Sequence, residues 1–542
     1  MDGVLAAAPG GQRDLLAGVP RWALCLLLVA ASVGLYARSL QASFVSDDFL
    51  LIFEPTWQAT PATSDHFRPL AILFLKGFLR LVGPEPVPYH LVLVGLHVLS
   101  VFLVFRFTYA LGGRKDIAGL TAVLYAVYLR HHEPVVWLAA GGNVLPAAVF
   151  GLLTLVTFQR GQCRSNYSDR NRFSNMRLAP YISRISRNKL ERHQDRASRS
   201  WRALSYGSFA LALLSSEWAI VTAGLLAALL WWRPTFGEDE EGGWGTPSAE
   251  MARTILPYAA IAAAYLPLQF AGAGFGKLTT TGAGYHFVGF KPALLAQWAR
   301  FFVYGWLPFL RLGTIGKDAI ATALLGGAII ASLVALARGS ATTKFWIVWI
   351  WMASAPFAAF GIFGPAERHF YLLAVGPSAL TAWAVVRGLA ALAKRWRGAA
   401  LAAGVVVGLG VAAAAVGIQG RIQAWVEAGR TVQHILAEIR ALHPALPSDS
   451  EILAVGFPRD NGTASILHQG LGAALRRAYG QPTLRVWYTF DSSIGDVLER
   501  TPPGAPEPKR YVLLYRGGHV RDMSSRYHEL KARLDPARWT LS

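Results

Sequence analysis

The chain has little charge and little cysteine for its length. Only 15% of its 542 residues are Asp, Glu, Lys or Arg, whereas soluble proteins average about 25%. This shortage excludes an ordinary cytosolic protein. Its two cysteines, Cys25 and Cys163, are too few for a disulfide framework or a cysteine-based zinc site. The fold must therefore depend on apolar burial, and 53% of the residues are hydrophobic.

Long apolar runs recur along residues 1–420. A helix needs about 20 such residues to cross a hydrocarbon layer of about 30 Å. The first run follows Arg13 and Arg21 and is expected to be an uncleaved anchor. The runs predict a mainly α, polytopic membrane protein of about 11 transmembrane helices. The predicted spans are 22–39, 89–110, 117–131, 138–159, 203–217, 218–233, 255–271, 317–337, 345–362, 370–388 and 399–418.

The formal charge of +20 is unevenly placed along the chain. Residues 160–202 form a basic insert with twelve Lys and Arg against three Asp and Glu. Basic residues collect in cytoplasmic loops, and Lys394 and Arg395 fall on the same side as the insert. We therefore expect a cytoplasmic N-terminus and an extracytoplasmic C-terminus, as in a multi-pass protein of the bacterial inner membrane. The insert could bind nucleic acid, but a cytoplasmic loop near anionic lipid headgroups is favoured, so no nucleic-acid partner is expected.

Residues 203–233 admit two interpretations. As one helix they would measure about 45 Å at 1.5 Å per residue, which is too long for one upright span and short for two. A single span would also move Lys394 and Arg395 to the outside. Two short helices meeting at Glu217 are therefore predicted.

From residue 421 to residue 542 the composition becomes that of a soluble domain. Strands are predicted at Glu451–Pro458, Thr483–Tyr488 and Tyr511–Tyr515, with helices at Ser465–Tyr479 and Ser524–Leu534. Alternating strands and helices predict a small extracytoplasmic α/β domain.

Four groups of ionisable residues lie outside the basic loops, and the predicted topology puts all four on the external side. Charged groups near membrane depth are costly, which makes such residues functional candidates. The first group is Asp47 and Asp48, directly after the first span. One carboxylate could take a proton from a hydroxyl while the other orients substrate. Equally, an Asp there could cap the apolar helix that begins at Phe49.

Two further groups each contain an arginine suited to a phosphate. Arg68 follows His66 and precedes His90 at the start of the second span; its guanidinium could fork onto two phosphate oxygens or pair with lipid headgroups. Glu367, Arg368 and Tyr371 head the tenth span. There a phosphate site built by Arg368, with Glu367 holding the arginine, is favoured over snorkelling to the interface.

The last group combines His131, His132 and Glu133 with Glu217 at the next external turn. These residue types can ligate metal, but adjacent histidines do not match the one-face helical spacing of a zinc motif. A polar turn that orients the first group is the favoured interpretation, and no metal ligand is assigned.

With these motifs the chain resembles the membrane-embedded GT-C glycosyltransferases. It is most similar to their protein O-mannosyltransferase-like branch, which includes the transmembrane and tetratricopeptide-repeat mannosyltransferases. The matching stretches are Phe44–Phe49, Phe67–Leu70 with Tyr89 and His90, His132–Trp137, Leu213–Glu217 and Ala366–Tyr371. The chain departs from the family at Ser216, where a lysine is frequent, and in having no tetratricopeptide repeat after the last span.

The resemblance implies a GT-C-like transmembrane domain over residues 1–420. It also implies a hexosyltransferase that moves a sugar such as mannose from a polyprenyl-phosphate donor to an acceptor hydroxyl outside the membrane. Asp47 or Asp48 would be the base of an inverting reaction, and the other candidate residues would bind substrate. The partners would be the lipid-linked sugar, a protein or glycan acceptor and membrane lipids, with no cofactor. A flippase of lipid-linked saccharides and a noncatalytic scaffold are the alternatives.

Overall fold

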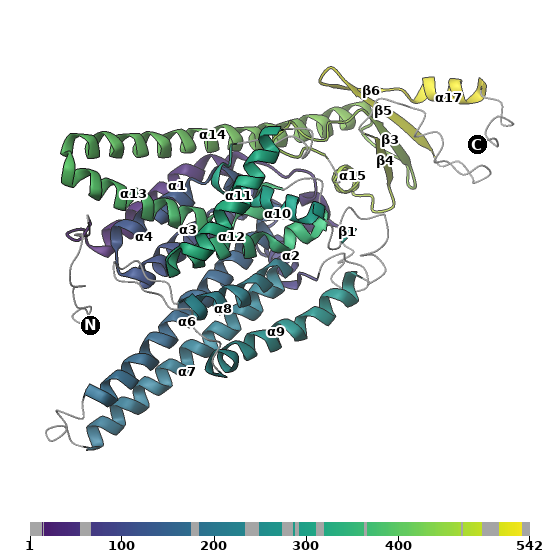
Figure 1. The fold of residues 1–542 in the computed structure, drawn as a ribbon. Helices are drawn as coiled ribbons and strands as arrows, with labels where there is room; N and C mark the ends of the chain where they lie inside the picture. Colours follow the sequence, from purple (N-terminus) through teal and green to yellow (C-terminus); the bar gives the residue numbers. More distant parts are fainter. Residues whose placement is uncertain are drawn as a thin grey trace.

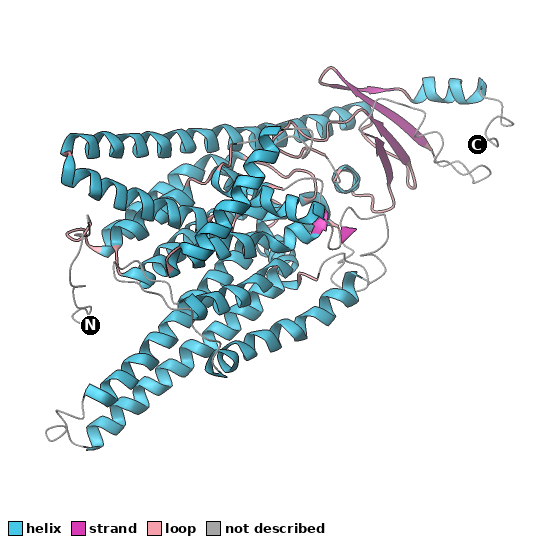
Figure 2. Ribbon diagram, viewed as in Figure 1, coloured by secondary structure: helices cyan, strands magenta, loops and turns pink. Residues whose placement is uncertain are grey.

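The computed structural model is mainly helical. It describes residues 14, 16–54, 67–174, 184–232, 249–273, 286–287, 292–309, 319–361, 366–467, 470–489 and 509–533. In these residues a bundle of long helices makes up most of the molecule, and a small sheet lies at one end (Figure 2). Apolar runs form helices in a membrane because a helix satisfies its backbone hydrogen bonds within itself.

Each range predicted to be a span contains a helix. These helices are α1 (Arg21–Tyr36), α3 (Pro86–Gly112), α4 (Lys115–Ala126), α6 (Leu138–Ser174), α7 (Arg184–Ser215), α8 (Val221–Trp232), α9 (Ala249–Ala273), α11 (Ala319–Arg338), α12 (Ala341–Ala359), α13 (Val375–Arg395) and α14 (Arg397–Leu442). Six segments among the described residues are long and apolar enough to cross a membrane. The prediction of a mainly helical integral membrane protein is confirmed, and the count of eleven spans stays a prediction.

Large apolar side chains on α1 and α14 point out of the bundle. Trp22 and Leu27 of α1 are 68% and 64% exposed, and Leu401 of α14 is 73% exposed. Outward-facing apolar surface of this size marks an interaction surface rather than a water-facing one. On helices of membrane-spanning length the natural partner is the lipid hydrocarbon.

Shorter segments join the long helices. They are η1 (Ala37–Gln41), η2 (Phe49–Phe53), α2 (Pro69–Val82), η3 (Leu129–His131), α5 (His132–Val136), η4 (Glu217–Ile220), α10 (Pro292–Trp306) and η5 (Glu367–Phe370), with β1 (His286–Phe287) paired antiparallel to β2 (Phe360–Gly361). Four of the predicted site motifs lie in or directly before these segments. The short segments therefore position most of the candidate site.

The basic insert differs from its expected form as a loop. Helix α6 continues to Ser174 and α7 begins at Arg184, so much of the insert is helical. The two helices lie side by side and project from the bundle (Figure 1). At its other end α7 stops at Ser215, and η4 begins at Glu217. The predicted break at Glu217 is thus confirmed.

Helix α14 connects the bundle to the sheet. It spans 46 residues and crosses the predicted domain boundary at residue 420 without a break. Figure 1 shows α14 running along the bundle and reaching the strands. The division at residues 420 and 421 stays a prediction, because a continuous helix marks no boundary by itself.

The C-terminal residues form the predicted α/β arrangement. The strand order is β4-β3-β5-β6, with β3 parallel to both β4 and β5, and β5 antiparallel to β6. The elements are β3 (Glu451–Val455), α15 (Leu471–Tyr479), β4 (Arg485–Thr489), β5 (Arg510–Arg516), β6 (His519–Asp522) and α17 (Ser524–Arg533). Helix α15 begins six residues later than predicted, because Ser465 instead pairs with Asp460 in an isolated bridge.

Candidate functional site

The segment after the first span holds its two aspartates in different environments. Asp48 is 1% exposed, whereas Asp47 is partly exposed. Oδ2 of Asp48 accepts the Val45 N–H at 3.0 Å, and its Oδ1 accepts the Ala139 N–H at 2.7 Å. Oδ1 of Asp47 accepts the Ser46 hydroxyl at 3.0 Å. The carboxyl group of Asp48 is thus enclosed, whereas that of its neighbour Asp47 remains partly exposed.

Asp48 joins the segment after α1 to the start of α6. Ala139 is the second residue of α6, so the carboxyl satisfies one of the unpaired N–H groups at that helix end. The expected cap of the Phe49 helix is wrong, because η2 receives no side-chain cap from Asp48. Burial raises the pKa of Asp48 to about 8, despite the two backbone N–H donors that lower it.

Arg68 forms a forked ion pair with Glu217. Nε of Arg68 lies 2.7 Å from Oε2 of Glu217, and Nη2 lies 2.5 Å from Oε1. Both side chains are mostly buried, yet about one-sixth of each remains exposed. The pair connects the start of α2 to the break between α7 and α8, so the guanidinium is fixed in orientation while one face stays reachable.

Arg368 is held by Glu133 and not by Glu367. Nη1 of Arg368 lies 2.5 Å from Oε1 of Glu133, whose Oε2 accepts the Arg368 backbone N–H at 2.9 Å. The guanidinium also lies over the Trp137 ring at 5.4 Å. The predicted Glu367–Arg368 pairing is therefore wrong: adjacent residues of a 3₁₀ turn point in different directions, and residues 235 positions apart meet instead.

Glu367 pairs with basic side chains other than Arg368. Its Oε2 lies 2.9 Å from Nε2 of His132, and its Oε1 pairs with Arg421 of α14 and lies 3.7 Å from Nη1 of Arg130. Burial raises the pKa of Glu367, but the hydrogen bond of His132 and the charge of Arg421 outweigh it and lower this pKa to about 2. Glu367 therefore ties η5 to α5 and α14 as an ionised group.

Replacing Glu367 with Gln should remove a pH-dependent part of the stability. A folded-state pKa of about 2, below the ordinary 4.5, means that this stability is present above pH 4.5 and is lost as the pH falls towards 2. The difference in unfolding free energy is at most roughly 3 kcal/mol, at 1.36 kcal/mol per pKa unit. Thermal unfolding in detergent between pH 7 and pH 3 measures it.

Glu427→Gln is the matched control for that experiment, because Glu427 is an exposed residue of α14. We expect its melting curve to follow that of the unsubstituted chain at every pH. A constant gap between Glu367→Gln and the unsubstituted chain down to pH 3 would contradict the ion-pair explanation.

His369 packs where the segments that carry Arg68–Glu217 and Arg368 meet. Its ring is buried and stacks on Phe357 with centroids 4.1 Å apart. Burial lowers the pKa of His369 well below its ordinary value, and the charges of Arg368 and Arg68 lower it further. Trp218, the neighbour of Glu217, also packs near this ring, with centroids 6.4 Å apart. The segments that carry the Arg68–Glu217 pair and Arg368 therefore pack together.

The remaining predicted residues divide into two sets. His66 lies outside the described residues. His90 and Tyr371 are completely buried, and the Tyr371 hydroxyl lies 2.8 Å from Nδ1 of His97. The ring of Tyr371 packs against His131 at 4.5 Å. His90 and Tyr371 are therefore enclosed, whereas the side chains of Arg68 and Arg368 keep exposed parts.

The histidines of the third group diverge. His131 packs among buried aromatic rings, including Tyr125 at 4.6 Å, while His132 and Glu133 pair with Glu367 and Arg368. They do not point at a common centre, which disfavours a metal site. Asp48 binds the backbone of Ala139 in α6, six residues beyond Glu133, and the expected orienting role of the His131–Glu133 turn stays a prediction.

Sequence reasoning missed three contributors to the site. Arg130 lies over the Tyr304 ring at 4.7 Å and near Glu367, and Arg421 pairs with Glu367. Trp137 supports Arg368 and stacks on Trp425 of α14. Arg421 could have been noticed in the sequence: it follows a predicted span on the side predicted to be external, where basic residues are disfavoured.

Residues of the C-terminal region contact the segment that carries the two aspartates. Ser46 has a φ of 44°, which non-glycine residues rarely adopt, and its N–H donates to the Ile466 carbonyl at 2.8 Å. Gly470 packs so closely that a Cβ there would lie 1.8 Å from the Ser46 carbonyl oxygen. The small α/β region therefore packs directly against the segment that carries Asp47 and Asp48.

Two arginines of α15 extend this contact. Nε of Arg476 lies 2.8 Å from Oε1 of Glu54, and the Arg477 guanidinium lies 3.6 Å from the centre of the Phe53 ring. On the same side, Gln433 of α14 donates to the Ser43 hydroxyl at 2.9 Å. Contacts from α14 and α15 thus hold both ends of the segment from Ser43 to Glu54.

Part of the chain matches known mannosyltransferases. It is 29% identical over 174 residues to human (Homo sapiens) protein O-mannosyl-transferase TMTC1, a match covering 28% of this chain and 18% of the relative. The mouse (Mus musculus) protein of that name is 29% identical over 165 residues, covering 25% of this chain and 17% of the relative. The resemblance to protein O-mannosyl-transferases is confirmed. Each match spans less than a fifth of the relative's length, and no family model matches the chain.

Solved membrane proteins show a loose likeness to the whole chain. ArnT from Cupriavidus metallidurans, bound to undecaprenyl phosphate, has a TM-score of 0.44 and 12% identity, covering 95% of each chain. The oligosaccharyltransferase AglB from Archaeoglobus fulgidus, in complex with an inhibitory peptide and a dolichol-phosphate, has a TM-score of 0.44 and 13% identity, covering 81% of this chain and 62% of AglB. Such TM-scores assign no role to any residue here.

Proposed function

We propose that the chain transfers a sugar, mannose in the first instance, from a polyprenyl-phosphate donor to a hydroxyl of a protein or glycan acceptor. The observation that carries this proposal is a pair of partly exposed arginines on segments that pack together: Arg68 is held by Glu217, whose neighbour Trp218 packs near the His369 ring, and Arg368 directly precedes His369. The aspartate segment and the arginines are connected, because Asp48 binds Ala139 and Trp137 lies beneath Arg368. The mannosyltransferase names of the matched relatives support the choice of sugar.

In this reaction the acceptor oxygen attacks the anomeric carbon as the bond from that carbon to the phosphate oxygen breaks. The electron pair leaves with the phosphate, which becomes polyprenyl phosphate, and the hydroxyl proton passes to an aspartate. Attack opposite the leaving group inverts the anomeric centre. Arg68 and Arg368 neutralise charge on the leaving phosphate, so the residues require no metal for this step.

Asp47 is the proposed base. A general base must come within hydrogen-bond reach of the acceptor hydroxyl, and the partly exposed Asp47 can do so. Asp48 is enclosed, and both of its oxygens already accept backbone N–H groups. Asp48 is therefore assigned to positioning: it fixes the segment against α6 while Asp47 faces the acceptor.

The paired carboxylates keep the arginines ready for a phosphate. Glu217 and Glu133 orient Arg68 and Arg368, and each guanidinium retains an exposed part. An arginine held in this way can add a phosphate oxygen to its fork without large rearrangement. His132, Glu367 and Arg421 hold η5 in place, whereas the buried His90 and Tyr371 support the interior.

The proposed topology places this chemistry outside the cytoplasm. Eleven spans put the N-terminus and the basic insert on the cytoplasmic side, following the distribution of Lys and Arg. The aspartate segment and the C-terminal region then face outward together, which agrees with their contact through Ser46 and Ile466. In a bacterium this membrane would be the inner membrane.

The function is tested with the full chain purified in detergent. Polyprenyl-phosphate mannose and a cell-envelope extract are supplied, and the release of polyprenyl phosphate and the label on the acceptor are measured. We expect both products in equal amounts. In vesicles, movement of the intact lipid-linked sugar across the bilayer without release would instead establish a flippase.

Arg68→Lys should raise the KM for the lipid-linked donor about tenfold, the size expected for one lost hydrogen bond to a charged group. Lysine keeps the charge but lacks the fork that holds Glu217 and a phosphate oxygen together. Arg80→Lys, at an exposed position of α2, is the matched control. An unchanged donor KM in Arg68→Lys would show that the Arg68–Glu217 pair is purely structural.

A further inference from the structure

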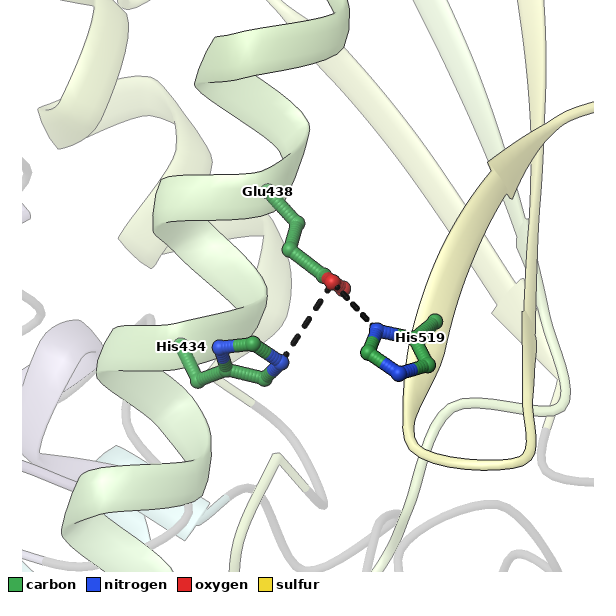
Figure 3. Close-up of side chains that lie close together, drawn as sticks. All are labelled: His434, Glu438 and His519. Atoms are coloured by element: carbon green, nitrogen blue, oxygen red, sulfur yellow. Dashed lines mark hydrogen bonds and ion pairs between the residues drawn. The ribbon is translucent and has the colours of Figure 1, made fainter.

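We propose that His434, Glu438 and His519 form a zinc site that pins the β5–β6 hairpin to α14 (Figure 3). His434 and Glu438 come from the last third of α14, and His519 is the first residue of β6. None of the three takes part in the proposed sugar transfer. The site is therefore independent of that function.

The three side chains point at a common centre. His434 Nε2 lies 3.4 Å from Glu438 Oε1, and His519 Nδ1 lies 2.7 Å from the same oxygen. One ligand atom from each residue fits within 4.8 Å of the others. Tetrahedral zinc, with its ligands 2.0–2.2 Å away, spaces them roughly 3.3 Å apart. Small side-chain rotations would convert the present arrangement into that geometry.

Local structure brings these ligands together. A spacing of four residues puts His434 and Glu438 on the same face of α14. Gly517 and Gly518 form the two-residue turn of the hairpin with φ values of 64° and 88°. Positive φ at both central positions is the mark of a tight type I′ turn, which glycine adopts without strain. The turn leads directly into His519 and presents it to α14.

The surroundings of Glu438 suit a metal ligand. Its Oε2 accepts the Val520 backbone N–H at 2.8 Å, leaving Oε1 for the metal. Carboxylate ligands are commonly oriented by such an outer hydrogen bond.

Two imidazoles and one carboxylate favour zinc over magnesium or calcium, which prefer sites made of oxygen ligands. Both histidines are more than half exposed, at 52% and 69%. This openness gives the ion an entry path and leaves its fourth position for water. Bound zinc would then connect helix α14 to the sheet through strand β6.

The experiment measures zinc itself. The full chain in detergent is stripped of metal and dialysed against zinc chloride at pH 7.5, and bound zinc per chain is determined together with the melting temperature. We expect the unsubstituted chain to bind one more zinc ion than His434→Ala or His519→Ala. Zinc should raise the melting temperature of the unsubstituted chain but not of these two variants. Glu438→Gln should bind at least about tenfold more weakly.

Glu427→Gln is the control, since it makes the same charge change about three helical turns before Glu438 on α14 and should keep the extra zinc. Melting temperatures without zinc report whether each variant is folded. Equal zinc stoichiometry in the unsubstituted chain, His434→Ala and His519→Ala would overturn the proposal and leave a hydrogen-bonded His–Glu–His cluster only. Equal stabilisation by magnesium chloride would also overturn it.

Discussion

Asp47→Asn is expected to abolish measurable sugar transfer while leaving the protein folded. Asparagine has nearly the same shape but cannot accept the acceptor proton, and general-base catalysis contributes about 10²–10⁴-fold to a rate. Asparagine keeps an Oδ1 that can accept the hydrogen bond of the buried Ser46 hydroxyl. Release of polyprenyl phosphate by the purified variant measures the effect, and its melting temperature should match that of the unsubstituted chain.

Asp48→Asn separates the two aspartates. The amide would place an NH₂ group against the N–H of Val45 or Ala139, which leaves a buried donor unsatisfied at a cost of about 1–3 kcal/mol. We expect a lower melting temperature together with partial loss of activity. Full activity of Asp47→Asn combined with an inactive but fully stable Asp48→Asn would reverse the assignment of base and positioning residue.

Gly470→Ala is expected to reduce turnover about 100-fold, the cost of a misplacement of about 1 Å at a reacting group. A Cβ at this position would lie 1.8 Å from the Ser46 oxygen and 2.5 Å from its carbonyl carbon, so backbone must move. Ser46 directly precedes Asp47, and any shift is passed to the proposed base. The measurement is kcat and donor KM: kcat should fall while KM changes little.

Gly472→Ala is the matched control, two residues further along the same part of the chain. A Cβ there would meet the Arg476 guanidinium at 3.4 Å, an ordinary contact. Alanine also favours helix over glycine, so α15 should be no less stable. If Gly470→Ala and Gly472→Ala turn over at the same rate, the C-terminal region does not position the aspartates.

Much of the fold could be predicted because its signals are local. Apolar runs of membrane length marked the positions of α3, α6 and α14, and the alternating patterns after residue 450 marked β3, β4 and β5. The length of residues 203–233 predicted the break at Glu217, since one upright helix would not fit the bilayer. The helical insert was missed, because its polar composition lacks the apolar stripe by which a helix is recognised.

The candidate site was predictable as a set of residues but not as a set of pairs. Charged side chains beside apolar runs are conspicuous, so Arg68, Glu217 and Arg368 could be singled out without a structure. Their pairing depends on how separate helices pack. Arg68 meets Glu217 across 149 positions, and spacing along the chain carries no information about such a contact.

Neighbouring residues were enough to predict a helical membrane protein with several apolar spans, its short charged motifs and the α/β character of its C-terminal part, because helix length, hydropathy and strand alternation are properties of contiguous residues. The packing of distant segments encloses Asp48 while leaving Asp47 partly exposed. It likewise brought Gly470 against Ser46 and His519 against Glu438. These contacts join segments hundreds or tens of residues apart, and the packing of the whole chain places them together.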